Sequence, residues 1–206
     1  MSSSPSTTST SQEDSESNSG STSSRKLKVT LLNSEWRSTK GDVSTINREL
    51  AIQLAKHPCV EVSVYLPQCS EEDKQDAARY NALLSKAEAM PGFDNPIDWL
   101  SFLPEGHAVD CVIGYGAVLG RQVQGIKRQC KCKWFQVVHA APEEMGMYKS
   151  YADAFSKGQK NRLAAELKLC EKADQVVAVG PKLAEAYLRA SGKDQDVLNL
   201  NPGIIL

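Results

Sequence analysis

The chain has 206 residues, with 24 lysines and arginines against 25 aspartates and glutamates, and its formal net charge is −1. This balance argues against a nucleic-acid partner, because domains that bind nucleic acids usually carry a strong positive charge. No stretch of the sequence is long and apolar enough to predict a transmembrane segment.

Six cysteines occur, and two of them, Cys130 and Cys132, form a C-x-C pair. No second pair and no histidine stands at zinc-ligand spacing from this pair, so we expect no metal site. Structural cysteines that stay reduced are typical of intracellular proteins, and we therefore predict a cytoplasmic protein.

The first 24 residues differ in composition from the rest of the chain. They hold twelve serines and four threonines but no lysine or arginine. Such a segment buries too little apolar surface to offset the entropy lost on ordering. It also lacks the basic start and apolar centre of a signal peptide. We predict a disordered, phosphorylatable tail over residues 1–24 and a single domain over residues 25–206.

The domain opens with a strand, a glycine-containing loop and a helix. Alternating apolar residues over 27–31 predict the strand, and residues 33–41 form a polar loop. The helix is predicted by an apolar stripe of Val43, Ile46, Leu50 and Leu54. This order is typical of a βαβ nucleotide-binding unit, because a helix N-terminus attracts anions. With the single glycine Gly41, it fits an ordinary first βα turn equally well.

Strands and helices alternate along the rest of the chain. Further strands are predicted over 60–66, 109–113, 134–138, 176–179 and 197–200. Helices are predicted over 71–89, 117–130, 155–172 and 181–191, with a short segment over 97–103. Six alternating strands predict an α/β fold: a single Rossmann-like domain with a six-stranded parallel sheet and helices on both faces. We expect the strand order 3-2-1-4-5-6, with the first and fourth strands flanking the switch point, where such sheets bind ligands.

That topology brings residues 33–42, 114–116, 139–144 and 180 to one rim of the sheet. His139 follows an apolar strand directly, and its imidazole could contact a sugar hydroxyl or act as a catalytic acid or base. A structural hydrogen-bonding role fits it as well. Glu143 and Glu144 could bind acceptor hydroxyls or simply be solvated carboxylates.

A glycine pattern, Gly114-x-Gly116-x-x-x-Gly120, follows the strand over 109–113. Its spacing differs by one residue from the dinucleotide fingerprint, and no acidic residue ends the next strand, where a ribose would need it. We therefore expect no nicotinamide, flavin or other bound cofactor. Gly114 and Tyr115 remain candidate substrate-binding residues, because they belong to the predicted rim.

Four short motifs occur in a characteristic order. They are Lys40-Gly41-Asp42-Val43 with Arg48-Glu49-Leu50-Ala51, then Val137-Val138-His139, then residues 173–179 (ADQVVAV), and finally Asn201-Pro202-Gly203-Ile204. Together, over about residues 27–206, they resemble the N-terminal half of family-4 type glycosyltransferases. Such enzymes have the GT-B fold, in which two Rossmann-like domains bind a sugar nucleotide between them.

The resemblance implies roles for particular residues. The N-terminal domain would hold mostly the acceptor, a carbohydrate or another small hydroxylated molecule. The loop of Lys40, Gly41 and Asp42 would approach the diphosphate of the sugar-nucleotide donor, and His139 would contact the donor sugar. The family loop usually carries a second glycine where this chain has Asp42, whose carboxylate would repel a diphosphate.

The second domain of such enzymes supplies most nucleotide contacts, and the 206 residues do not include it. Our leading hypothesis is therefore the acceptor-side half of a sugar-nucleotide-dependent hexosyltransferase. It would be incomplete without a donor-binding C-terminal domain in cis or in trans, and whether it is an enzyme by itself stays open. The alternative is a non-catalytic binding or regulatory module on a Rossmann-like scaffold.

Overall fold

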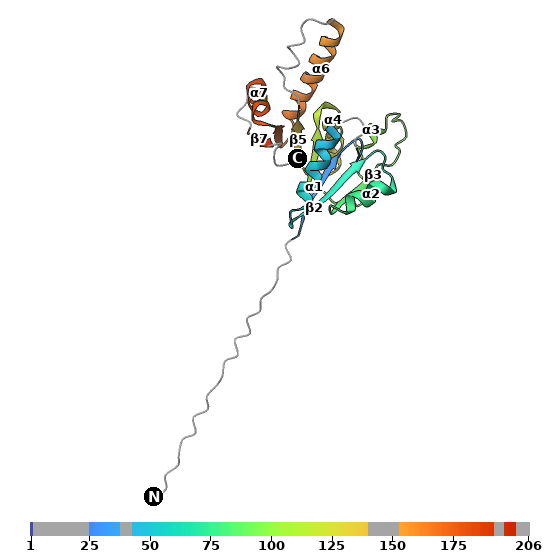
Figure 1. Ribbon diagram of the computed structural model, residues 1–206, viewed down its shortest axis with the longest axis vertical. Helices are drawn as coiled ribbons and strands as arrows, with labels where there is room; N and C mark the ends of the chain where they lie inside the picture. Colours follow the sequence, from blue (N-terminus) through green and yellow to red (C-terminus); the bar gives the residue numbers. More distant parts are fainter. Residues whose placement is uncertain (2–24, 38–42, 140–152, 192–195, 201–206) are drawn as a thin grey trace.

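The computed structural model describes residues 1, 25–37, 43–139, 153–191 and 196–200 (Figure 1). Several predictions concern residues outside these ranges: the disordered tail, the loop residues Lys40, Gly41 and Asp42, the acidic pair Glu143 and Glu144, and the motif over 201–204.

The described residues form one sheet of seven parallel strands in the order β3-β2-β1-β4-β5-β6-β7. The strands are β1 (Leu27–Leu32), β2 (Val60–Leu66), β3 (Ala82–Lys86), β4 (Cys111–Tyr115), β5 (Lys133–Val138), β6 (Gln175–Val179) and β7 (Val197–Leu200). The helices are α1 (Val43–Ala55), α2 (Glu71–Ala78), α3 (Pro96–Trp99), α4 (Gly116–Gln129), α6 (Asp153–Cys170) and α7 (Pro181–Ser191). The predicted α/β Rossmann-like class is confirmed, with one strand more than expected.

The additional strand corrects the predicted helix over 71–89, which is wrong beyond residue 78. Ser70 caps α2 through a capping box with Asp73, and Asn81 then adopts a left-handed φ of 59° that interrupts the helical path. In β3 the buried Leu84 pairs with Val64 of β2, while Leu83 is 62% exposed. An Ala/Leu-rich run suits a helix by itself, and here pairing with a neighbouring strand overrides that preference.

The missed strand also corrects the predicted strand order. The expected order placed residues 109–113 beside the second strand and residues 134–138 beside the first. In the structure β1 pairs with β4, Val29 lying opposite Cys111, and β5 lies beyond β4. β3 occupies the edge instead. The switch point therefore lies between β1 and β4.

Helices cover both faces of the sheet. Parallel crossovers are right-handed, so connections that run in opposite directions across a sheet place their helices on opposite faces. α1 and α2 follow steps toward β3, whereas α4, α6 and α7 follow steps toward β7. Every residue of the central strand β4 is buried, as expected for a strand covered on both sides.

The glycine pattern after β4 has a packing explanation. A Cβ atom on Gly120 would lie 2.3 Å from the Gln136 side-chain oxygen, and one on Gly114 would lie 2.9 Å from the Gly120 Cα. Gln136 is itself fully buried and donates a hydrogen bond to the Gly116 carbonyl oxygen. The missing side chains let α4 lie directly on β4 and β5.

Candidate functional site

The segment after β1 is tied to the first turns of α1 by buried polar side chains. The Asn33 side chain accepts a hydrogen bond from the Ser34 backbone N–H at 2.9 Å and donates to the Ser44 carbonyl oxygen at 3.4 Å. Asn47 donates to the Leu32 carbonyl oxygen at 2.6 Å. These bonds fix Ser34 at the carboxyl edge of the sheet, next to the switch point.

A cavity of about 420 Å³ opens at this edge. It is lined by residues from five parts of the fold: the end of β1, α3, the β4–α4 turn, the end of β5, and α6. Its lining consists of Ser34, Ile97, Tyr115, Gly116, Ala117, Val118, Leu119, His139, Arg162 and Glu166. Two of the predicted site residues, Tyr115 and His139, thus share one cavity with the start of the loop over 33–42. Gly114 does not line it and packs under α4 instead.

Gly116 leaves open the space between His139 and Glu166. Its φ of 57° lies in the left-handed region that favours glycine. A Cβ atom there would lie 3.5 Å from His139 Cε1 and 3.9 Å from Glu166 Oε1. Any larger residue at this position would therefore reach into the space that the imidazole and the carboxyl group border.

His139 directly follows β5, as predicted, and its side chain is exposed at the cavity. Its ring lies against the buried Tyr115 ring, with centroids 5.0 Å apart and planes inclined by 34°. A ring held in this way can present a nitrogen atom to a bound molecule, which suits either hydrogen bonding or proton transfer.

Glu166 on α6 is a site residue that the sequence prediction missed. Its side chain is only 3% exposed. Burial raises the pKa of its carboxyl group to about 7, although the nearby Tyr187 hydroxyl and the Arg162 guanidinium lower it somewhat. The available signal was its position: it lies at helical spacing from Leu163 and Cys170, on the apolar side of the helix, where a carboxylate is unusual.

Hydrogen-bonding groups around Glu166 are left without partners. Glu166 Oε1 and the hydroxyls of Tyr115 and Tyr187 are all buried, and none has a hydrogen-bond partner in the part of the chain that the structure describes. Tyr187 approaches the carboxyl group without reaching hydrogen-bond geometry. Buried polar groups are normally paired, so this cluster is suited to a bound molecule.

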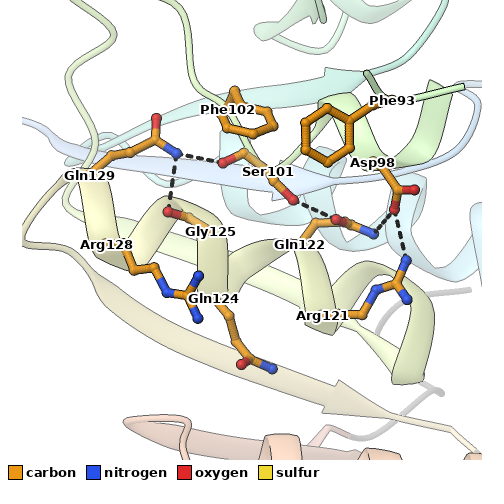
Figure 2. Close-up of a pocket in the computed structure, with 10 residues that line it drawn as sticks. All are labelled: Phe93, Asp98, Ser101, Phe102, Arg121, Gln122, Gln124, Gly125, Arg128 and Gln129. Carbon is orange, nitrogen blue, oxygen red and sulfur yellow. Dashed lines mark hydrogen bonds and ion pairs between the residues drawn. The ribbon is translucent and has the colours of Figure 1, made fainter. Parts of the chain in front are cut away.

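A larger cavity, of about 690 Å³, lies between α4 and the segment that includes α3 (Figure 2). Most of its polar side chains are engaged in hydrogen bonds with neighbouring residues of the lining. Asp98 accepts hydrogen bonds from Arg121 and Gln122, at 2.7 and 3.0 Å. Ser101 donates to Gln122, and Gln129 donates to the Ser101 carbonyl oxygen. This network joins α3 to α4, and we interpret it as structural despite the larger volume.

The comparison with known families decides the assignment. Residues 30–206 match the family described as family 4 glycosyltransferase in conflict systems. The chain belongs to this family. The resemblance inferred from the sequence motifs is thereby confirmed, and the cavity beside His139 is a feature of a family 4 domain.

A solved structure resembles the domain. Sucrose-phosphate synthase from Thermosynechococcus elongatus superposes with a TM-score of 0.60 at 16% sequence identity, over 84% of this chain. At that identity the likeness shows the fold alone. The aligned part is 47% of the synthase chain, so this chain spans about half the length of that protein. No curated protein matches the chain significantly.

Among the helices described by the structure, none is long and apolar enough to cross a membrane.

The six cysteines are all free thiols.

Proposed function

We propose that this family 4 domain is the acceptor-side half of a sugar-nucleotide-dependent hexosyltransferase. Its acceptor, a carbohydrate or another small hydroxylated molecule, would bind in the cavity beside His139. The observation that carries the proposal is that Ser34, Tyr115 and His139 reach one cavity from three elements at the switch point. Parallel α/β sheets bind ligands at this place.

The proposed roles follow the family resemblance and the cavity lining. His139 would contact the donor sugar, while Tyr115 would line the part of the cavity that holds the acceptor. Glu143 and Glu144, shortly after His139 in sequence, would supply acceptors for sugar hydroxyls. Gly114 would act indirectly, by letting α4 come close to the sheet. We expect these reactions in the cytoplasm, where the free thiols would stay reduced.

Transfer would require a second domain. The leaving diphosphate needs preorganised positive charge, and in this proposal a donor-binding domain in cis or in trans supplies it. We therefore expect purified 1–206 to bind sugar-type ligands weakly and to transfer none by itself. Turnover of a sugar nucleotide by the pure chain would contradict this expectation.

Binding tests the acceptor-side assignment. NMR titration of the isotope-labelled chain with neutral methyl glycosides should shift signals of Ser34, Tyr115 and His139. His139→Ala should weaken the binding severalfold. His57→Ala is the matched control, because His57 is an exposed histidine in the turn before β2, on the opposite edge of the sheet. Equal loss in both variants, or no binding at tens of millimolar sugar, would overturn the proposal.

The alternative function, a non-catalytic binding or regulatory module, is favoured by Asp42. Its carboxylate would repel a diphosphate that approaches Gly41. Calorimetry with uridine diphosphate at low salt should then show hardly any binding to the wild-type chain and measurably tighter binding to Asp42→Gly. Equal affinities would mean that Asp42 does not guard a phosphate site.

A further inference from the structure

The buried carboxyl group of Glu166 has no structural explanation in the fold around it. Glu166 lines the cavity, and its buried Oε1 atom lacks a hydrogen-bond partner among the described residues, although the side chain is 97% buried (3% exposed). A polar atom left in this state destabilises the folded chain. Residues that serve only packing do not need a carboxyl group there.

The titratable groups near Glu166 come from several elements. Tyr115 reaches it from β4 and Tyr187 from α7, both through hydroxyls that are also unpartnered in the described structure. His139 lies across the Gly116 gap. On α6 itself, Arg162 stands one turn earlier and Cys170 one turn later. Arg162 is the cation that the structure places near the carboxyl group, and its side chain is exposed to solvent.

This environment distinguishes between kinds of ligand. A carboxylate oxygen attracts hydroxyl donors and repels phosphate oxygens. Tyr115 also lines the cavity, and its hydroxyl can both donate and accept a hydrogen bond, which suits a polyol. The cavity wall around Glu166 therefore matches a neutral sugar better than a phosphorylated one.

We propose that Glu166 is a specificity-determining residue of this cavity, whose carboxylate accepts a hydrogen bond from a hydroxyl group of a neutral sugar. The inference rests on the proposed function, since it assumes that the cavity beside His139 holds the acceptor. The inference goes further by naming Glu166 as the residue that selects a neutral sugar and repels a phosphate group in that part of the cavity.

A proton should be linked to binding. Because a hydroxyl donor favours the ionised carboxylate, the sugar must displace the proton that Glu166 holds below pH 7. Affinity should therefore rise with pH, and the dissociation constant at pH 8 should be about tenfold smaller than at pH 6. In Glu166→Gln an acceptor oxygen remains but cannot ionise, so binding should persist without that pH dependence.

The experiment is an NMR titration of the full chain at pH 6 and pH 8. The probes are the methyl α-glycosides of glucose, galactose and mannose, with glucose 6-phosphate as the anionic comparison. Wild type should show the tenfold change with at least one neutral probe, and Glu166→Gln should show less than twofold. Glu171→Gln is the matched control and should behave as wild type, because Glu171 is an exposed glutamate directly after the end of α6.

The outcomes separate this inference from the proposed function. His139→Ala should bind more weakly yet keep the pH dependence, which rules out the imidazole as its source. Neutral-sugar binding that is pH-independent, or equally pH-dependent in Glu166→Gln, overturns the role of Glu166 and leaves the proposed function standing. Tighter binding of glucose 6-phosphate than of the neutral glycosides would likewise overturn the role of Glu166 and leave the proposed function standing. Binding of none of the four probes overturns both.

Discussion

The Gln136 side chain donates a hydrogen bond to the Gly116 carbonyl oxygen over 2.8 Å. This bond joins β5 to the first turn of α4 beneath the cavity, and the same amide accepts a hydrogen bond from the Trp134 indole at 3.3 Å. Both ends of a fully buried amide are thus engaged. The position of Gly116, and with it the space between His139 and Glu166, depends on this residue.

Gly120→Ala should destabilise the domain by about 1–3 kcal/mol. The added methyl group would sit 2.3 Å from the Gln136 amide oxygen, and moving that amide breaks its bonds to Gly116 and Trp134. Urea unfolding measures the loss. Gly158→Ala in α6 is the control, because nothing lies within 4 Å of its Cβ position and alanine favours the helix. If the two variants unfold at the same urea concentration, the close approach of α4 is not as described.

Gly116→Ala should weaken ligand binding as well as stability. The left-handed φ of 57° costs an alanine about 1–2 kcal/mol. Its methyl group would also stand 3.5 Å from His139 and narrow the cavity. Gly180→Ala shares the conformational strain, with a φ of 103°, but has open space around it. Unfolding and sugar titration of both variants should show destabilisation in both and weaker binding only in Gly116→Ala.

Glu166→Gln should stabilise the domain at alkaline pH. The folded carboxyl group has a pKa raised to about 7 by burial, above its ordinary value of 4.5. The folded state therefore binds a proton more tightly than the unfolded chain, and stability falls as the pH rises from about 4.5 to 7. The glutamine variant lacks this loss, so at pH 8 it should exceed wild type by about 1–3 kcal/mol. Equal stabilities at pH 8, measured by urea unfolding, would mean that the folded carboxyl ionises as easily as the unfolded one.

Asp174→Asn should destabilise the domain by about 1–2 kcal/mol at neutral pH. Although burial alone would raise its pKa, hydrogen bonds from Lys127, the Trp134 backbone N–H and Lys133 hold the pKa at about 2. The folded state therefore favours the carboxylate, and this contribution is present above pH 4 and disappears as the pH falls toward 2. Wild type and variant should converge in stability near pH 2. A constant difference down to that pH would contradict the role of the charge.

The sequence predicted the parts of the fold that depend on local pattern. The apolar alternation of β1 and the continuous apolar run of β4 identify buried strands, and His139 was found because it follows such a strand directly. The strand β3 could not be found in this way. Its Ala82–Lys86 run suits a helix locally, and only pairing with β2 makes it a strand.

Glu166 was not predicted as a site residue because its burial, like the pairing of β3, depends on contacts between distant parts of the chain. A glutamate in a helix is usually solvated, and its burial depends on Tyr115 and Tyr187, which come from distant parts of the sequence. Tyr115 and His139 were predicted to share a rim because parallel topology brings strand ends together. Which side chains fill the space between them is a question of packing, which spacing alone does not answer.

The walls of the cavity are far apart in the chain, from Ser34 after β1 to Glu166 on α6. During synthesis the site therefore stays incomplete until α6 has emerged and packed on α4. A fragment that stops before residue 153 would retain the strands β1 to β5 but lack the wall that carries Arg162 and Glu166. We expect such a fragment to bind no sugar. The cavity would then depend on the part of the chain from α6 to β7.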